Sequence, residues 1–241
     1  MQKKLKKLKR KLAEKYFVPE AQISYSQFGE DLILSLFFAH NEITNPVYLD
    51  IGANEPKYIS NTYYFYEKGA RGVLIEPNPY LYEKLKSQRS NDIVLNVGIG
   101  FNDDVEEADF YMFPNYANGL STFSKNEADH WEKIGMKGMG KIPVEKTLKM
   151  PLIPINQILE KYFAGKSPDF ISLDVEGLDL KILKALDFEK YRPTLICVET
   201  MMYDENQKTY KTNEITDFMV SKNYFVYADT RVNTIYCKND F

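Results

Sequence analysis

The stretch Tyr48-Leu49-Asp50-Ile51-Gly52-Ala53-Asn54 joins a run of apolar residues to a glycine loop. Its first half is typical of a buried parallel strand that ends in a polar residue. Gly52 lets the backbone approach a ligand closely, and Asn54 is one of the few other residue types that tolerate the left-handed conformation of such loops. The stretch therefore predicts a strand that leads into a ligand-binding loop.

Runs of the same kind recur along the chain and alternate with helical patterns. Strands are predicted over residues 47–50, 73–76, 93–96, 170–174 and 195–199, and helices over residues 60–68, 79–89 and 178–186. Residues 224–228 and 234–237 predict a closing antiparallel hairpin. We expect an α/β fold, a doubly wound and mostly parallel sheet of seven strands, with ligands at the carboxyl ends of the parallel strands.

Length and composition indicate one domain with additions. The 241 residues, 44% of them hydrophobic, suit a single core. Residues 101–150 interrupt the alternation, with weak strand signals at 109–113 and 144–148, and are predicted to be an insertion or lid. The expected organisation is a basic helical arm over residues 1–20 and one domain over residues 21–241.

Charge is distributed unevenly. Residues 1–15 hold eight Lys or Arg and one acid, a net charge of +7, which leaves −10 for the rest of a chain whose net charge is −3. The acidic body argues against nucleic acid as a partner. Leu5, Leu8 and Leu12 fall at helical spacing in the arm, so residues 1–15 either contact an anionic membrane surface or pack on protein.

The two cysteines, Cys197 and Cys237, each lie in an apolar run, which predicts reduced, buried thiols. No stretch approaches the length of about 20 apolar residues that a membrane span requires. The expected location is the cytoplasm, with the inner membrane surface as an option for the arm. Oligomeric state is left open by the sequence.

Glu76 follows Asp50 by 26 residues, the interval of one strand-helix-strand step. An acid at that strand end can accept hydrogen bonds from both hydroxyls of an adenosine ribose. The chain lacks the G-x-G-x-x-G and G-x-x-x-x-G-K-[ST] patterns that seat phosphates. The pair predicts an adenosine site without a phosphate site; the structural alternative is that Asp50 caps a helix and Glu76 faces water.

Several motifs together resemble the FkbM family of S-adenosylmethionine-dependent methyltransferases. They run in the family's order and spacing from about residue 25 to residue 199. The matching segments are 26–31 (SQFGED), 50–54 (DIGAN) with Pro56, 60–63 (SNTY), 68–73 (KGARGV), 75–79 (IEPNP), 121–123 (STF) and 173–177 (LDVEG).

The resemblance implies a Rossmann-like class I methyltransferase fold, S-adenosylmethionine as cofactor, and methylation of oxygen atoms of sugars or natural products. By the same resemblance Asp50 and Gly52 lie by the methionine part of the cofactor, Glu76 holds the ribose, and Asn96 with Val97 lies by the adenine.

Two further parts of the expected cofactor site are a segment before the first strand and a residue of the glycine loop. The resemblance suggests that Ser26 and Gln27 form a flap over the pocket, while a helix N-cap at Ser26 is the alternative. Asn54 stands where many methyltransferases have a second glycine, and Asn is the usual residue of the FkbM family there.

Candidate catalytic residues follow the fourth and fifth predicted strands. Asp174 and Glu176 follow one, and Glu199 ends the other. A carboxylate there can take the proton from an attacking hydroxyl, or can hold Mg²⁺ that acidifies the hydroxyl. Glu176 could instead cap the next helix. His130 is a second candidate base in the predicted lid.

The sequence thus predicts an O-methyltransferase that acts on a hydroxyl of a sugar or glycan precursor, as in the synthesis of a capsule or surface polysaccharide. Two alternatives stay open, a methyltransferase of a small natural product and a non-catalytic module that binds an adenosyl group. A nicotinamide-dependent oxidoreductase is disfavoured because the glycine pattern for a pyrophosphate is missing.

Overall fold

A computed structural model of the protein describes residues 22–101, 106–136, 138, 140–203 and 208–241. The predicted basic arm, including the membrane contact proposed for residues 1–15, lies outside the described residues. Among the helices that are described, none is long and apolar enough to cross a membrane.

The centre of the protein is a sheet of seven strands in the order β11-β12-β8-β7-β1-β2-β3. Five strands run parallel: β1 (Tyr48–Ile51), β2 (Gly72–Ile75), β3 (Ile93–Leu95), β7 (Phe170–Leu173) and β8 (Leu195–Glu199). The hairpin of β11 (Tyr224–Asp229) and β12 (Asn233–Lys238) closes the sheet, with β12 antiparallel to β8. The predicted seven-stranded, mostly parallel sheet with a C-terminal antiparallel hairpin is confirmed.

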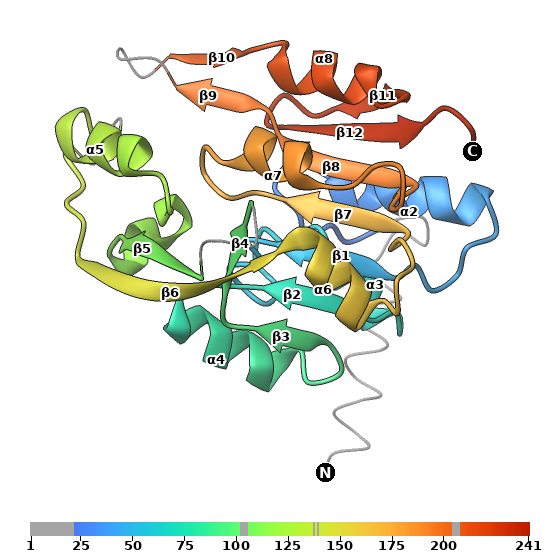
Figure 1. Ribbon diagram of the computed structural model, residues 1–241, viewed down its shortest axis with the longest axis horizontal. Coiled ribbons are helices and arrows are strands. Elements are labelled where there is room, and N and C mark those ends of the chain that lie inside the picture. The colour runs from blue at the N-terminus through green and yellow to red at the C-terminus, as the bar shows by residue number, and fades with distance from the viewer. Residues whose placement is uncertain (1–21, 102–105, 137, 139, 204–207) are drawn as a thin grey trace, which may run out of the picture.

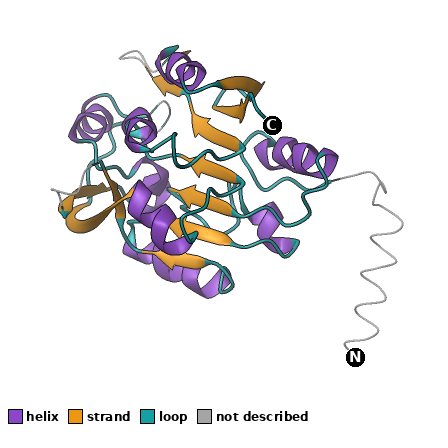
Figure 2. Ribbon diagram, turned by 45° about the vertical axis from the view of Figure 1, so that its right-hand side comes forward, coloured by secondary structure: helices purple, strands orange, loops and turns teal. Residues whose placement is uncertain are grey.

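Helices cover both faces of this sheet (Figure 2). On one face α2 (Glu30–His40), α3 (Tyr63–Glu67) and α4 (Pro79–Gln88) enclose one apolar core. On the other face α6 (Ile155–Tyr162), α7 (Asp179–Ala185) and α8 (Glu214–Ser221) enclose a second core. Two cores on opposite faces are what a doubly wound sheet requires, so this part of the prediction is also confirmed.

The two cysteines lie inside one of these cores. Cys197 on β8 and Cys237 on β12 are buried, free thiols in the core beside α2. This agrees with the predicted role of each thiol as a small apolar side chain.

The first helix after β1 is shorter than predicted. Residues 60–68 were expected to be helical, but α3 begins at Tyr63. Ser60 accepts a hydrogen bond from the backbone N–H of Tyr63 at 3.1 Å. Ile59 just before it has a φ of 55°, which no helix allows. The serine therefore closes a turn ahead of the helix.

Residues 98–154 are more ordered than the predicted irregular insertion. They form a second sheet with the strand order β4 (Gly98–Gly100), β6 (Lys146–Pro154) and β5 (Glu107–Met112). A 3-10 helix, η1 (Asn115–Leu120), and α5 (Lys125–Lys133) lie between β5 and β6 in the chain. Two small apolar clusters of their own hold them together. In Figure 1 the carboxyl ends of β2 and β7 point toward the side where β5, α5 and a short hairpin of β9 (Met201–Tyr203) and β10 (Thr209–Lys211) lie.

Candidate active site

The loop after β1 is held against the end of β7. Gly52 has a φ of 82°, and a Cβ atom built on it would lie 1.8 Å from the carbonyl oxygen of Asp174. The backbone N–H of Asp174 in turn donates to the carbonyl of Ile51 at 3.0 Å. Only glycine allows this approach, so the loop after β1 and the first candidate catalytic acid, Asp174, are in direct contact.

Glu76, the acid that follows β2, is fixed in place by backbone donors. Its carboxylate accepts from the N–H of Asn54 at 2.8 Å and from the N–H of Asn78 at 2.8 Å. Burial raises the pKa of Glu76 to about 7. Since a carboxylate offers about four lone-pair positions, two stay available for ligand hydroxyls.

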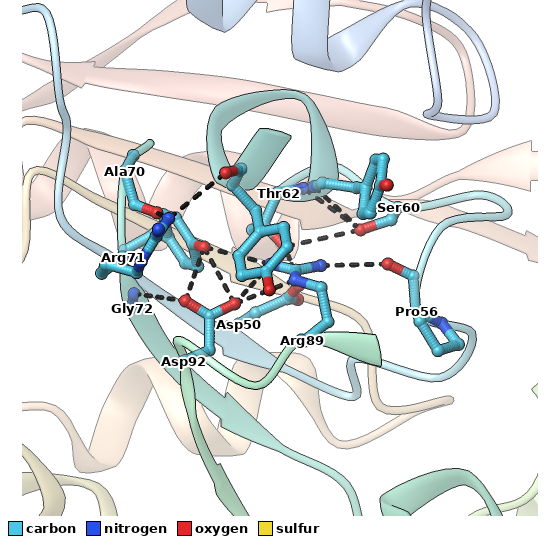
Figure 3. A network of polar contacts seen from close by, with 12 residues as sticks. Asp50, Pro56, Ser60, Thr62, Ala70, Arg71, Gly72, Arg89 and Asp92 are labelled. Atoms are coloured by element: carbon cyan, nitrogen blue, oxygen red, sulfur yellow. Dashed lines mark hydrogen bonds and ion pairs between the residues drawn. The ribbon is translucent and has the colours of Figure 1, made fainter. Parts of the chain in front are cut away.

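The Asp50 carboxylate takes part in a buried hydrogen-bond network. Its carboxylate accepts from the Thr62 hydroxyl at 2.6 Å, and Thr62 accepts from the buried Arg89 guanidinium at 3.2 Å (Figure 3). Arg89 also pairs with Asp92 at 2.9 Å, with no more than 1% of either side chain exposed. Burial raises the pKa of Asp50. Its carboxylate therefore anchors the loop to the neighbouring helices.

A cavity of about 790 Å³, part of it open to solvent, lies over this loop. Four of the predicted cofactor residues line it: Gly52, Asn54, Glu76 and Val97. Asn118, Gly119 and the segment from Ser121 to Phe123 also line it. The side-chain oxygen Oδ1 of Asn54 is buried and has no hydrogen-bond partner among the described residues, so it is free to accept from a ligand.

The other predicted cofactor residues stand outside the cavity lining. Asn96 donates to the carbonyls of Glu76 and Pro77 at 2.8 and 2.9 Å, so it supports the turn after β2. Ser26 and Gln27 line a neighbouring groove that meets the cavity at Ile59. The Ser26 hydroxyl accepts from the N–H of Gly29 at 3.1 Å just before α2, a contact of the capping kind.

Asp174, Glu176 and Glu199 come together at the carboxyl ends of β7 and β8. One carboxylate oxygen of each lies within 4.8 Å of the others, a spacing that could hold a metal ion. Asp174 lines the first cavity, and the surrounding protein raises the pKa of its carboxyl to about 6 by desolvation. Burial, together with the charge of Asp174, raises the pKa of Glu176 and of Glu199 well above the usual range.

The arrangement assigns different protonation states to these acids. Asp174 and Glu199 share a hydrogen bond. Because the pKa of Glu199 is raised further, Glu199 holds the proton and donates to an ionised Asp174 near neutral pH. Asp174 is thus the acid of the three that is best suited to accept a proton.

Glu176 sits on a strained turn that the lid segment supports. It has a φ of 54°, which is uncommon for a residue other than glycine, and the Thr122 hydroxyl donates to its carbonyl at 2.9 Å. Helix α7 has Leu178 as its N-cap residue and no side-chain cap hydrogen bond, so the alternative role of Glu176 as a helix cap is not seen. The carboxylate of Asp179 accepts from the N–H of Val175 at 3.3 Å, in the turn before α7.

A second cleft of about 1200 Å³, also partly open, begins where the first cavity ends. Glu176 lines both. His130 and Trp131 of α5 line this cleft on the lid side, and the nitrogens Nε2 of His130 and Nε1 of Trp131 are buried without a described partner. His130 therefore belongs to the second cleft and not to the first cavity.

Sequence reasoning found Glu176, Glu199 and His130 of the second cleft but not its other residues. Ser121 to Phe123 carried a signal because they match a family motif. Glu127 on α5 and Tyr203 on β9 carried none, since single polar or aromatic residues in irregular stretches have no distinguishing pattern.

A family model described as the methyltransferase FkbM domain matches residues 50–226. The 1,6-didemethyltoxoflavin-N1-methyltransferase of Burkholderia thailandensis, solved with 1,6-didemethyltoxoflavin and S-adenosylhomocysteine, is 10% identical, with a TM-score of 0.40 over 87% of this chain and 76% of that one. A TehB-like SAM-dependent methyltransferase from Corynebacterium glutamicum is 8% identical, with a TM-score of 0.42 over 98% and 97%. A methyltransferase from Geobacter sulfurreducens is 8% identical, with a TM-score of 0.42 over 95% and 86%. The comparison with curated proteins gave no match.

Proposed function

Because the chain belongs to the methyltransferase FkbM domain family, we propose that it transfers a methyl group from S-adenosylmethionine to a hydroxyl of a sugar or glycan precursor. One observation carries the proposal. The first cavity and the second cleft meet at Glu176. Asp174 lines the first cavity, and Glu199 lines the second cleft. A donor in the first and an acceptor in the second would meet beside these carboxylates.

The residues of the first cavity suit an adenosyl cofactor. Glu76 is anchored by two backbone N–H groups and keeps lone pairs for the two ribose hydroxyls. Asn54 offers a buried, unpartnered acceptor beside the loop at Gly52, where the amino group of the methionine part would lie. When bound, the cofactor supplies an electrophilic methyl group on a sulfonium.

For the chemical step we propose that Asp174 accepts the proton of the attacking hydroxyl. A base with a pKa of about 6 is ionised at neutral pH and still accepts a proton readily. Glu199 orients Asp174 through their shared hydrogen bond. In the alternative, Asp174, Glu176 and Glu199 hold Mg²⁺ that acidifies the hydroxyl; we favour the metal-independent route because the spacing of these acids in the sequence is not a distinctive metal motif. His130, in the second cleft, is the reserve candidate for the base.

Residues 101–150 are proposed to act as a lid over both halves of the site. Thr122 and Phe123 line the first cavity, and α5 lines the second cleft. The Thr122 hydroxyl donates to the backbone carbonyl of Glu176, so a movement of the lid would shift Glu176 at the junction of the two cavities. We also propose a cytoplasmic location, with residues 1–15 as a peripheral membrane contact.

Calorimetry on the purified full chain tests the cofactor. S-adenosylmethionine and S-adenosylhomocysteine should bind, and NAD should not, because the loop at Gly52 has no seat for a pyrophosphate. A methyl-labelled donor with a panel of saccharide acceptors then tests the reaction. NAD binding as tight as that of S-adenosylhomocysteine would refute the cofactor assignment. Donor binding without transfer to any hydroxyl would favour the non-catalytic alternative.

A further inference from the structure

The second cleft carries an unusual set of charges for an acceptor site. We name it the acceptor cleft, defined by its walls from α5, residues 176–181, residues 199–203 and residues 210–215. Among the described residues, its lining contains one lysine, the exposed Lys181. Against this stand five carboxylic acids: Glu127, Glu176, Asp179, Glu199 and Glu214.

Among the described residues, the basic side chains that line the cleft with these acids are His130, near Glu127, and the exposed Lys181. None of the five forms an ion pair with a described lysine, arginine or histidine. Asp179 is compensated by backbone N–H groups at the start of α7, but Glu127 and Glu176 receive no hydrogen bond to their side chains from a described residue. An uncompensated group of this kind must hold protons or bind a cation.

Aromatic rings complete the lining. Trp131 and Tyr203 meet edge to face with their ring centroids 5.5 Å apart, and Tyr210 lies on the neighbouring strand. Ring faces beside carboxylates are the surroundings in which proteins bind alkylammonium groups. A cation is attracted to whichever of these acids are ionised, whereas a phosphate or carboxylate is repelled by them and finds one lysine in the described lining to offset the repulsion.

We propose that the acceptor cleft binds a cationic acceptor, a molecule with a protonated amine near the hydroxyl to be methylated, and rejects acceptors that carry phosphate or carboxylate at that end. The inference rests on the proposed function and names its substrate class more narrowly. Glu127 and Glu214 are assigned as specificity-determining residues, because they line the cleft and not the first cavity.

The test uses the full chain saturated with S-adenosylhomocysteine and three probes with the same ring, namely glucosamine, glucose and glucose 6-phosphate. Saturation-transfer NMR titrations give their affinities. Glucosamine should bind at least about tenfold more tightly than glucose, as expected for charge-assisted hydrogen bonds, and glucose 6-phosphate should bind most weakly.

Two variants with the same charge change show whether the preference comes from the cleft. Glu214→Lys places a cation in the cleft at an exposed position of α8, and Glu83→Lys places one on an exposed position of α4. Glu214→Lys should abolish the preference for glucosamine, and Glu83→Lys should keep it. S-adenosylhomocysteine binding is the readout for the proposed function. If it binds but glucosamine shows no advantage over glucose, or Glu214→Lys changes nothing, the charge inference is wrong while the cofactor assignment stands; if it does not bind, both are wrong.

Discussion

The backbone N–H of Asn54 donates to the Glu76 carboxylate at 2.8 Å, which makes the loop after β1 and the acid after β2 a single unit. Asn54 can point its N–H there because its φ of 51° reverses the chain after Gly52. The proposed cofactor site is therefore assembled in the ligand-free protein, and its parts should respond together to substitution.

Gly52→Ala should disrupt this unit. Its Cβ atom would lie 1.8 Å from the Asp174 carbonyl oxygen, so strand β1 and the end of β7 must separate. Gly140→Ala is the control, because Gly140 also has a positive φ, of 76°, but no atom within 4 Å of a built Cβ. We expect Gly52→Ala to lower the free energy of unfolding by about 1–3 kcal/mol more than Gly140→Ala, the usual cost of overpacking. Denaturant unfolding measures the difference, and equal losses would contradict the close approach.

Glu76 predicts a pH-dependent affinity for S-adenosylhomocysteine. The pKa of Glu76 is raised to about 7 in the ligand-free protein, and ribose hydroxyls donate best to its ionised form. Affinity should therefore rise as the pH increases through about 7. Glu76→Gln should flatten this profile and weaken binding by about 1–3 kcal/mol. Calorimetry across this pH range, with Glu83→Gln as a control, measures both effects; an unchanged profile in Glu76→Gln would assign the titration to another group.

The contrast between Glu76 and Asp50 shows what the sequence could predict. Both end apolar runs, so their place at the carboxyl edge followed from strand length and spacing. Side-chain direction did not enter that reasoning. Residues alternate between the two faces of a strand, and Asp50 shares a face with Tyr48, whose hydroxyl also bonds to Arg89. Asp50 thus turns toward the helices on that face, and its partner Thr62 is distant enough in sequence to leave no pattern.

The second sheet was only partly predictable for another reason. Strand β6 contains Lys146, Lys149 and two prolines, and much of it is exposed, so it lacks the apolar run of a buried strand. Helix α8 and the hairpin of β9 and β10 were not predicted either. These elements pack on the rim of the core, where few positions are buried and apolar periodicity is weak. Part of the wall of the acceptor cleft comes from β9, β10 and α8.

The acids at the junction predict that the stability of the protein decreases as the pH rises. The pKa of Asp174 is raised to about 6 and that of Asp179 to about 7, while the pKa values of Glu176 and Glu199 are raised well above the usual range. Between the unfolded pKa of about 4 and these values, the native state binds more protons than the unfolded state. The contribution of these groups to the stability of the ligand-free protein is therefore most favourable below about pH 4. It becomes less favourable as the pH rises through 6 and 7.

Thermal unfolding between about pH 5 and 8 measures this slope. Glu199→Gln should reduce the slope, because it removes one acid that binds a proton in the native state and keeps a donor for Asp174. A melting temperature that rises over this range in the wild type, or a slope that Glu199→Gln leaves unaltered, would show that the junction acids titrate normally.

The last prediction separates the two roles of Asp174. If Asp174 is the base, Asp174→Asn should reduce turnover by about 10²- to 10⁴-fold, the usual contribution of general-base catalysis, while S-adenosylhomocysteine still binds. A chelator should then have little effect. If Asp174 holds a cation with Glu176 and Glu199, a chelator should abolish turnover, Mg²⁺ or Mn²⁺ should restore it, and Glu176→Gln should be as severe as Asp174→Asn. The pH profile adds an independent test, because a base with a pKa of about 6 requires turnover to rise through pH 6 and then level off. We expect the first set of results, since a proton held by Glu199 leaves Asp174 as the ionised acid that faces the first cavity. Near wild-type turnover by Asp174→Asn would exclude both roles and direct attention to His130 in the acceptor cleft.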